Sequence, residues 1–399
     1  MRPSGHLPTL IASFLHFDVS FMLWVLLGAL GIAIAESVGL TPAEKGLVVA
    51  IPTLSGSLLR VPMGILGDRL GGKRVGLAML AFLFLPLAIG WQMGGGLPTL
   101  VAVGLLLGVA GASFAVALPL ASRWYGPERQ GLAMGIAAAG NSGTVIANLA
   151  APQLAAHVGW HNVLGLAMVP LALVLVAFAL LAKDSPSRPP GQSLGTSLSV
   201  LADHDIWRFS LLYGVTFGGY VGLSSFLPLF LHDQYGADAV LAGLLTSAAA
   251  FIGSGIRPIG GYIADRIGGV RLLSVLLLGI GGAYAVGAVS PPLWWMVLVT
   301  MVLMACLGMG NGAVFQLVPQ RFRQQIGIAT GVVGAIGGLG GFLLPTLLGL
   351  IKQTSGSFGP GFAVLAGLAV VALGVVRALV AIEHGWRFGA EGAPSIEAA

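Results

Sequence analysis

The sequence has 399 residues, of which 56% are hydrophobic and 8% carry a charge, and its mean hydropathy is +0.95. Soluble proteins use about 25% charged residues, so this composition excludes a soluble fold and indicates an integral membrane protein. The formal net charge of +5 does not indicate a nucleic-acid partner, because the basic residues fall mainly in the connections between apolar segments. The single cysteine, Cys306, excludes an internal disulfide.

Twelve apolar segments follow one another along the chain, each near or above the roughly 20 residues that a membrane-spanning helix needs. They run over 14–35, 43–66, 74–92, 98–124, 131–156, 161–182, 207–231, 239–264, 271–289, 293–318, 325–351 and 360–381. None shows the alternation of polar and apolar residues that a membrane β-barrel requires. The sequence therefore predicts an all-α membrane protein with twelve transmembrane helices.

The connection at 183–206, rich in Pro, Ser and Gly, is the one long polar stretch between apolar segments. It predicts a division into a six-helix half at 1–182, a cytoplasmic linker at 183–206, and a second six-helix half at 207–399 with a short cytoplasmic tail. Lys and Arg mark the cytoplasmic side of a membrane protein. With both termini in the cytoplasm, all but four of the 19 basic residues fall on that side. Lys45 and Lys352 then lie outside, and Arg60 and Arg257 lie within the membrane.

Residues 52–74 recur at 249–271, and each copy is an apolar run that carries one arginine and ends in a charged Asp-Arg-x-Gly-Gly turn. The repeat aligns Arg60 with Arg257, Asp68 with Asp265, and Arg69 with Arg266. At about 1.5 Å of rise per residue, each arginine lies about 12 Å above its aspartate, near the middle of a bilayer. The turn has two interpretations: its charges anchor the topology, or they lock the two halves during gating.

The two membrane arginines have no expected carboxylate partner. Asp18 is the one acidic residue inside an expected span, and it falls in the first turn of the 14–35 helix. A structural arginine in a membrane is normally paired. Guanidinium groups hold planar oxyanions through forked hydrogen bonds, so two unpaired arginines at equivalent positions predict a small-anion site. The alternative is that each arginine bonds backbone carbonyls or reaches a water-filled vestibule.

Several other polar and aromatic side chains fall at the same expected depth. They are Asn141, Asn311, Phe114, Tyr213, Phe217 and Tyr220. We interpret them as hydrogen-bond donors and ring walls around the anion site. Taken singly, each amide or tyrosine could instead bond a neighbouring helix, and each phenylalanine could simply fill the core.

The repeat continues beyond the arginines, since 108–119 matches 308–319 and 131–135 matches 327–331. Parallel six-helix repeats and the turn GDRLGGKR at 67–74 resemble the major facilitator superfamily, in which substrate binds at the midplane between halves. The stretches 16–31, 138–152, 310–322 and 331–345 are similar to the nitrate/nitrite porter family, with its Gly-rich fifth and eleventh helices.

This resemblance implies site residues. It assigns substrate binding to Arg60, Arg257, Asn141 and Tyr213, with Phe114 and Phe217 as flanking rings; spacing leaves Tyr220 as a rival to Tyr213, and Asn311 comes from depth alone. The candidate gating residues are Asp68, Arg69, Asp265, Arg266, Gly140, Gly143, Gly337 and Gly340. Glycine faces would let helices of opposite halves slide or bend, with static close packing as the equal alternative.

No nucleotide-binding loop, paired-carboxylate site or metal-ligand cluster is evident in the sequence. We therefore expect no cofactor, no metal, no enzymatic activity, and neither a nucleotide nor a nucleic acid as partner. The resemblance implies a transporter of nitrate and nitrite in the cell (inner) membrane, working by alternating access, and we expect it to be a monomer.

Exchange of nitrate for nitrite is the favoured mode, because unpaired positive charge would oppose closure of a site without anion. Proton-coupled symport is the alternative, with Asp18 as the candidate titrating group. An exchanger of organic phosphate or carboxylate is a further alternative, although such substrates would favour extra Lys or His in the cavity. The alternative from another functional class is a non-transporting membrane sensor or scaffold.

Overall fold

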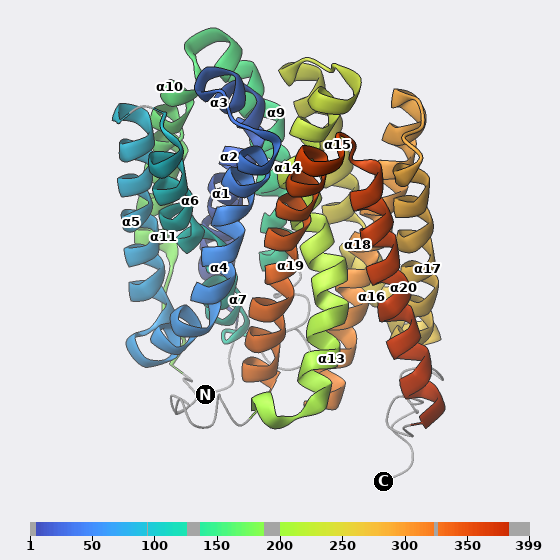
Figure 1. The fold of residues 1–399 in the computed structure, drawn as a ribbon. Coiled ribbons are helices and arrows are strands. Elements are labelled where there is room, and N and C mark those ends of the chain that lie inside the picture. The colour runs from blue at the N-terminus through green and yellow to red at the C-terminus, as the bar shows by residue number, and fades with distance from the viewer. Residues whose placement is uncertain (1–4, 94, 126–135, 187–199, 323–325, 383–399) are drawn as a thin grey trace.

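The computed structural model describes residues 5–93, 95–125, 136–186, 200–322 and 326–382 (Figure 1). These residues form helices and turns, and no strand occurs within them. Eleven helices among them, some built from two or three consecutive elements, are long and apolar enough to cross a membrane. The protein is thus an all-helical, multi-pass membrane protein, as the composition predicts.

The helices of the first half are α1 (Leu7–Trp24), α2 (Leu26–Ala29), α3 (Gly31–Val38), α4 (Pro42–Leu70), α5 (Gly72–Gln92), α6 (Leu97–Gly111), α7 (Phe114–Ser122), η1 (Ala139–Ser142), α9 (Gly143–Val158), α10 (Trp160–Leu166) and α11 (Met168–Leu181). Those of the second half are η2 (Val200–Ala202), α13 (His204–Tyr213), η3 (Gly214–Gly218), α14 (Gly219–Tyr235), α15 (Ala239–Gly255), α16 (Arg257–Ile267), α17 (Gly269–Ala288), α18 (Leu293–Arg321), α19 (Ile326–Ser355) and α20 (Gly359–Ile382). Several of these elements lie within one span, as α6 and α7 do in Leu97–Ser122. Grouped in this way, they make the twelve helices of two pseudo-symmetric six-helix halves.

The expected span at 131–156 is described only in part, as η1 and α9, because residues 131–135 lie outside the described chain. Most of the expected linker, residues 187–199, lies outside it as well. The first helix starts earlier than expected, at Leu7 instead of residue 14. The His6 side chain accepts a hydrogen bond from the Thr9 N–H, and Pro8 occupies the first turn, so these residues cap the start. Asp18 therefore lies in the body of α1, and the prediction that it sits in the first turn is wrong.

Local irregularities interrupt several spans at the level where site residues were expected. The fourth span breaks between α6 and α7, directly before Phe114. Asn141 belongs to the short 3-10 helix η1, and Phe217 to the π-helix η3. A break at Ile256 separates α15 from α16, so Arg257 is the first residue of the new helix. Such distortions free backbone groups and redirect side chains, and π-turns are frequent at functional sites.

The two halves meet along α4 and α19 and along α9 and α15, at the centre of the bundle (Figure 1). Glycine permits the closest approach: a Cβ on Gly46 of α4 would lie 2.4 Å from the Pro345 carbonyl oxygen of α19. The outward faces of the helices carry large apolar side chains, with Leu173 and Leu180 of α11 68% and 73% exposed. Only a lipid environment accommodates such a surface without aggregation.

Candidate functional site

Arg60 lies in the middle of α4 and is 1% exposed. Its Nε–H donates to the Gly111 carbonyl at 3.1 Å, within the first half. Its Nη1 donates to the Gly334 carbonyl of α19 at 2.5 Å, which crosses to the second half. The remaining nitrogen, Nη2, is buried and has no hydrogen-bond partner. A buried guanidinium with an unused donor is costly, so this group has free capacity for an acceptor.

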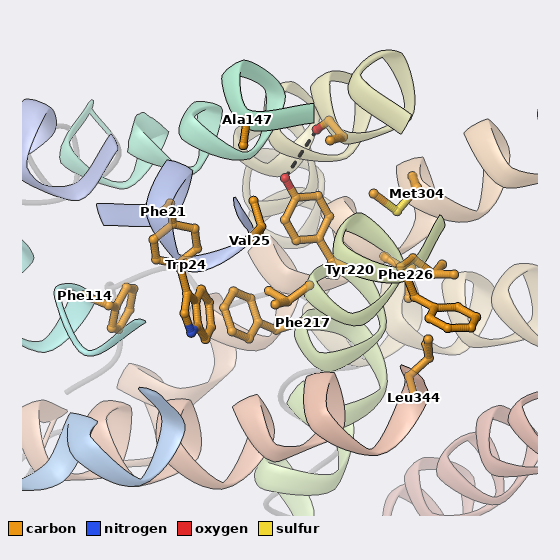
Figure 2. Close-up of a cluster of buried hydrophobic side chains, with 14 of the residues drawn as sticks. Phe21, Trp24, Val25, Phe114, Ala147, Phe217, Tyr220, Phe226, Met304 and Leu344 are labelled. Carbon is orange, nitrogen blue, oxygen red and sulfur yellow. Dashed lines mark hydrogen bonds between the residues drawn. The ribbon is translucent and has the colours of Figure 1, made fainter. Parts of the chain in front are cut away.

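Three aromatic rings surround the Arg60 guanidinium. Its Cζ lies 4.9 Å from the ring centroid of Phe217 and 5.5 Å from those of Trp24 and Phe114. The three rings come from η3, α1 and α7, and Figure 2 shows Trp24 between the other two. Ring faces attract cations most strongly where water is excluded, so this enclosure stabilises the positive charge without neutralising it. We call Trp24, Phe114 and Phe217 the aromatic enclosure.

Arg257 is half-buried, and one of its terminal nitrogens, Nη1, is buried without a partner. Its Cζ lies 5.6 Å from the centroid of Phe315 on α18. The Phe315 ring also contacts Phe114 at 5.9 Å and Tyr213 at 4.8 Å. Phe315 therefore connects the surroundings of the two arginines. The two guanidiniums and the Tyr213 hydroxyl are near enough to interact electrostatically.

The two rival tyrosines have different surroundings. Tyr213 is fully buried and stacks on Phe217, with centroids 4.8 Å apart and planes 1° from parallel. The Tyr220 hydroxyl instead bonds the Thr144 hydroxyl at 3.0 Å and the Ser254 hydroxyl at 2.5 Å. Figure 2 shows this hydroxyl pointing toward the helix that carries Ala147. Tyr213 thus belongs with the arginines, while Tyr220 joins α14 to α9 and α15.

Both candidate asparagines are buried, with Asn141 2% and Asn311 1% exposed. The side-chain oxygen of each has no hydrogen-bond partner. Asn141 lies in η1, one helical turn before Thr144, whose hydroxyl donates to the Asn141 backbone carbonyl at 2.8 Å. No described contact joins Asn311 to either arginine, so its assignment still rests on depth.

No Asp or Glu among the described residues forms an ion pair with Arg60 or Arg257. The nearby oxygen atoms are carbonyls and hydroxyls, which carry no net charge. The region therefore concentrates two positive charges among apolar rings. Such a region attracts a small anion that can supply acceptors to both guanidiniums. In the part of the chain that the structure describes, no cluster of His, Cys, Asp and Glu side chains could hold a metal ion.

The charged turns differ between the halves. Asp68 at the end of α4 is bonded by Arg123, which follows α7 in the same half. Arg69, Asp265 and Arg266 are exposed, and the Arg266 guanidinium lies 4.4 Å from the Tyr262 ring centroid. The described ion pairs that join the halves are found at the opposite end of the bundle, where the His232 ring of α14 also lies 3.7 Å from the Glu36 carboxylate of α3. There Lys45 of α4 bonds both carboxylate oxygens of Asp233 of α14, at 2.8 and 2.9 Å.

The four candidate gating glycines all pack inside their own half. A Cβ on Gly140 would lie 2.9 Å from the Asp18 backbone nitrogen, and one on Gly143 would lie 1.9 Å from the Asp18 carbonyl oxygen. A Cβ on Gly337 would lie 2.5 Å from the Tyr213 ring, and one on Gly340 would lie 2.3 Å from the Gly214 carbonyl. The expectation that these glycines face the opposite half is wrong. Glycines of α19 that do so include Gly334, Gly338, Gly341 and Gly349, opposite Arg60, Ser57, Thr53 and Pro42.

Sequence reasoning did not identify two residues of this region, Trp24 and Phe315. Trp24 donates from its indole N–H to the Pro52 carbonyl at 2.7 Å, which fixes its ring beside Arg60. Phe315 lies in the 308–319 repeat of the segment that holds Phe114. That correspondence was the available signal for Phe315. Trp24 had none, because its role depends on the contact that its indole, at the end of α1, makes with Pro52 and Arg60 of α4.

The family model of the Major Facilitator Superfamily matches residues 12–345. The nitrite extrusion protein of Bacillus subtilis is 34% identical over 364 residues, covering 91% of both chains. The probable nitrate/nitrite transporter NarK2 of Mycobacterium tuberculosis is 34% identical and covers 89% of this chain and 91% of its own. The probable nitrate/nitrite antiporter NarK1 of Thermus thermophilus is 33% identical and covers 93% of this chain and 90% of its own.

Solved structures show the same fold at low sequence identity. The nucleoside transporter NupG superposes with a TM-score of 0.73 at 16% identity, over 93% of this chain and 99% of its own. The human organic anion transporter MFSD10 superposes with a TM-score of 0.71 at 15% identity, over 92% and 99%. Fold, family model and relatives agree, and the chain belongs to the nitrate/nitrite porter family of the Major Facilitator Superfamily.

Proposed function

We propose that this protein carries nitrate and nitrite across the cell membrane by alternating access, without enzymatic chemistry. In this proposal residues 1–182 and 207–399 are the two moving halves, and 183–206 is the cytoplasmic linker. The anion binds between Arg60 and Arg257, with Asn141, Asn311 and Tyr213 as further hydrogen-bonding groups. Similarity to relatives whose names specify nitrate or nitrite supports the choice of substrate.

The observation that carries the proposal is that Arg60 and Arg257 each keep a buried N–H nitrogen without a partner. A planar oxyanion presents oxygens in the plane of the guanidinium fork, which suits paired hydrogen bonds. Phe114, Phe217 and Phe315 offer flat faces for an ion of the same shape. Tyr220 is engaged by Thr144 and Ser254, and this favours Tyr213 as the tyrosine that contacts substrate.

Exchange of nitrate for nitrite follows from the same charges. When two guanidiniums approach in a dry interior without an anion, the free energy rises because both lose water and because they repel each other. A bound anion removes much of that cost, so the loaded protein changes conformation more readily than the unloaded one. The Thermus thermophilus relative, named a probable nitrate/nitrite antiporter, supports this mode.

We assign both termini to the cytoplasm, since Lys and Arg concentrate at that end. The Lys45–Asp233 pair then lies at the outer end, where it holds the halves together. Asp68, Arg69, Asp265 and Arg266 at the inner end would engage when that end closes. Gly140, Gly143, Gly337 and Gly340 pack helices inside their own half, and in this proposal they let those helices shift as the cavity changes its opening. The substrate pathway lies within one chain, and we propose that a monomer in the lipid bilayer suffices.

Counterflow in proteoliposomes tests this proposal. Uptake of labelled nitrate is measured with and without internal nitrite, and with and without a proton gradient. Exchange predicts strong stimulation by internal nitrite and little response to the gradient. Uptake that requires the proton gradient and ignores internal nitrite would instead support symport, with Asp18 as the candidate titrating group. Absence of any nitrate or nitrite flux would contradict the substrate assignment.

A further inference from the structure

Asp18 of α1 is the one carboxylate, among the described residues, that lies in the body of a candidate span. Every other described acidic residue within a span falls in its first or last turn. Asp18 is half-buried and forms no ion pair with a described basic residue. A carboxylate near an anion site should repel the substrate, so its retention needs a physical reason.

The Asp18 carboxylate is held by the end of η1. The Ser142 hydroxyl donates to Asp18 Oδ1 at 2.6 Å, and the backbone amide of Gly143 faces the same carboxylate. Ser142 is the residue that caps α9, yet its hydroxyl makes no capping bond to its own helix. The negative group at this helix start therefore comes from α1. The start of a helix favours negative charge, so the carboxylate is directed toward α9.

The backbone of α1 lies directly against η1. A Cβ on Gly143 would lie 1.9 Å from the Asp18 carbonyl oxygen, and a Cβ on Gly140 would lie 2.9 Å from the Asp18 nitrogen. Glycine at both positions lets the two backbones approach this closely. The carboxylate and the Ser142 hydroxyl are thus fixed relative to each other by the helix contact as well as by their hydrogen bond.

Asn141 lies between Gly140 and Ser142, two residues at which η1 contacts α1. It belongs to a short 3-10 turn whose own hydrogen bonds are weak. The hydrogen bonds of a 3-10 helix have poorer geometry than those of an α-helix, so a short one depends on outside contacts. The Asn141 side-chain oxygen is buried without a partner, which is consistent with an amide kept for a ligand.

We propose that Asp18 is a positioning residue for the anion site, which acts through the Ser142 hydroxyl to hold Asn141 in place. This inference rests on the proposed function, because Asn141 is the residue through which it reaches the substrate. It differs from the symport alternative, in which the same carboxylate would carry a proton. In a positioning role the essential feature is an oxygen that accepts from Ser142, not the negative charge.

The test compares nitrate uptake by Asp18→Ala, Ser142→Ala and Asp18→Asn in proteoliposomes. Loss of one hydrogen bond to a charged group corresponds to about a tenfold change in an equilibrium. We expect Asp18→Ala and Ser142→Ala each to raise KM by about that factor, and the double variant to be no worse than either single variant. Asp18→Asn keeps the acceptor oxygen and should retain a KM within about threefold of wild type.

The decisive arm combines Asp18→Ala with Asn141→Ala. If Asp18 acts through Asn141, Asp18→Ala should add little to the KM increase that Asn141→Ala causes by itself. Additive increases would overturn the inference, as would equal loss in Asp18→Asn and Asp18→Ala. Ser142→Ala removes one hydroxyl outside α1, and it keeps the test valid if Asp18→Ala fails to fold.

Ser13→Ala provides the matched control. Ser13 is fully buried on the same helix, and its hydroxyl has no hydrogen-bond partner, so its removal should leave KM unchanged. A wild-type protein that fails to move nitrate would count against the proposed function itself. Wild-type transport together with a normal KM in Asp18→Ala and Ser142→Ala would reject the positioning role alone.

Discussion

Arg60 on α4 donates a hydrogen bond from Nη1 to the carbonyl oxygen of Gly334 on α19, at 2.5 Å, and so joins the two halves at their centre. An anion that binds Arg60 needs N–H groups of this same guanidinium. An anion can take the free Nη2 while Nη1 holds Gly334, so binding and the contact between α4 and α19 share one guanidinium. This shared group gives a local route by which an anion can change how the halves are held together.

The two tyrosines should respond differently to loss of the hydroxyl. Tyr213→Phe removes a group that interacts with both arginines, and we expect KM for nitrate to rise by up to about tenfold. Tyr220→Phe removes bonds to Thr144 and Ser254, so it should loosen the packing of α14 and lower thermal stability with little change in KM. Uptake kinetics and thermal unfolding of the two variants check this assignment. A reversed pattern would make Tyr220 the substrate residue.

Trp24 contributes both a ring and an N–H. Trp24→Ala removes the cation–π contact with Arg60 and the bond to the Pro52 carbonyl. A desolvated cation–π contact contributes about 2 kcal/mol to holding the Arg60 guanidinium in place, so its loss should misplace this group and lower nitrate affinity by up to about tenfold. Trp24→Phe keeps a ring and should lose less.

The control for the Trp24 variants is Trp294→Ala, because Trp294 is 66% exposed on the outer face of α18. Affinity is read from uptake kinetics. Wild-type affinity in Trp24→Ala would show that this ring does not contribute to the anion site.

The Lys45–Asp233 pair should bias the protein toward the conformation described here. Reversing either charge places like charges together and should favour states in which this end is open. Each charge reversal should shift the conformational equilibrium by only about fivefold, because both side chains of the pair are partly exposed to solvent. The measurement is thiol labelling of Thr53→Cys, a position buried at the contact between α4 and α19, in a Cys306→Ser background.

The double reversal, Lys45→Asp with Asp233→Lys, restores opposite charges and should return labelling to the wild-type rate. Unchanged labelling in both single reversals would show that this ion pair does not hold the halves together. If the double variant is labelled as fast as the single variants, the ion pair likewise does not hold the halves together.

Close packing around η3 predicts a stability difference between two glycines. A Cβ on Gly340 would lie 2.3 Å from the Gly214 carbonyl oxygen, whereas a Cβ on Gly374 of α20 would meet nothing within 4 Å. Gly340→Ala should therefore destabilise the protein by about 1–3 kcal/mol, while Gly374→Ala should be neutral or slightly stabilising. Thermal unfolding in detergent measures both. Equal midpoints for the two variants would contradict the packing of α19 on η3.

Hydropathy and the internal repeat were sufficient to predict the helices, the pair of membrane arginines and the lack of a described carboxylate partner for them. The helices follow from hydropathy along the chain. The arginine pair follows from the repeat, because equivalent positions in the two halves lie at the same depth in the membrane. The start of α1 was missed because hydropathy does not detect a capping residue such as His6. That error placed Asp18 too near a helix end and concealed its contact with Ser142.

Contacts between helices could not be predicted in the same way. A regular α-helix would place Tyr213, Phe217 and Tyr220 along one face, and this left the choice of tyrosine open. The π-helix η3 changes the turn between them, so Tyr213 stacks on Phe217 while Tyr220 bonds α9 and α15. Trp24 reaches Arg60 because the end of α1 places its ring against α4, and Phe315 reaches Arg257 because α18 lies beside α16.

Equilibrium binding of nitrate to the purified protein tests the central claim most directly. Calorimetry should detect nitrate binding to the wild type and a loss of at least about tenfold in Arg60→Lys and in Arg257→Lys, because an ammonium lacks the planar fork. Arg69→Lys, at an exposed arginine of the same helix as Arg60, should bind as the wild type does. Wild-type affinity in folded Arg60→Lys and Arg257→Lys proteins would contradict the two-arginine anion site.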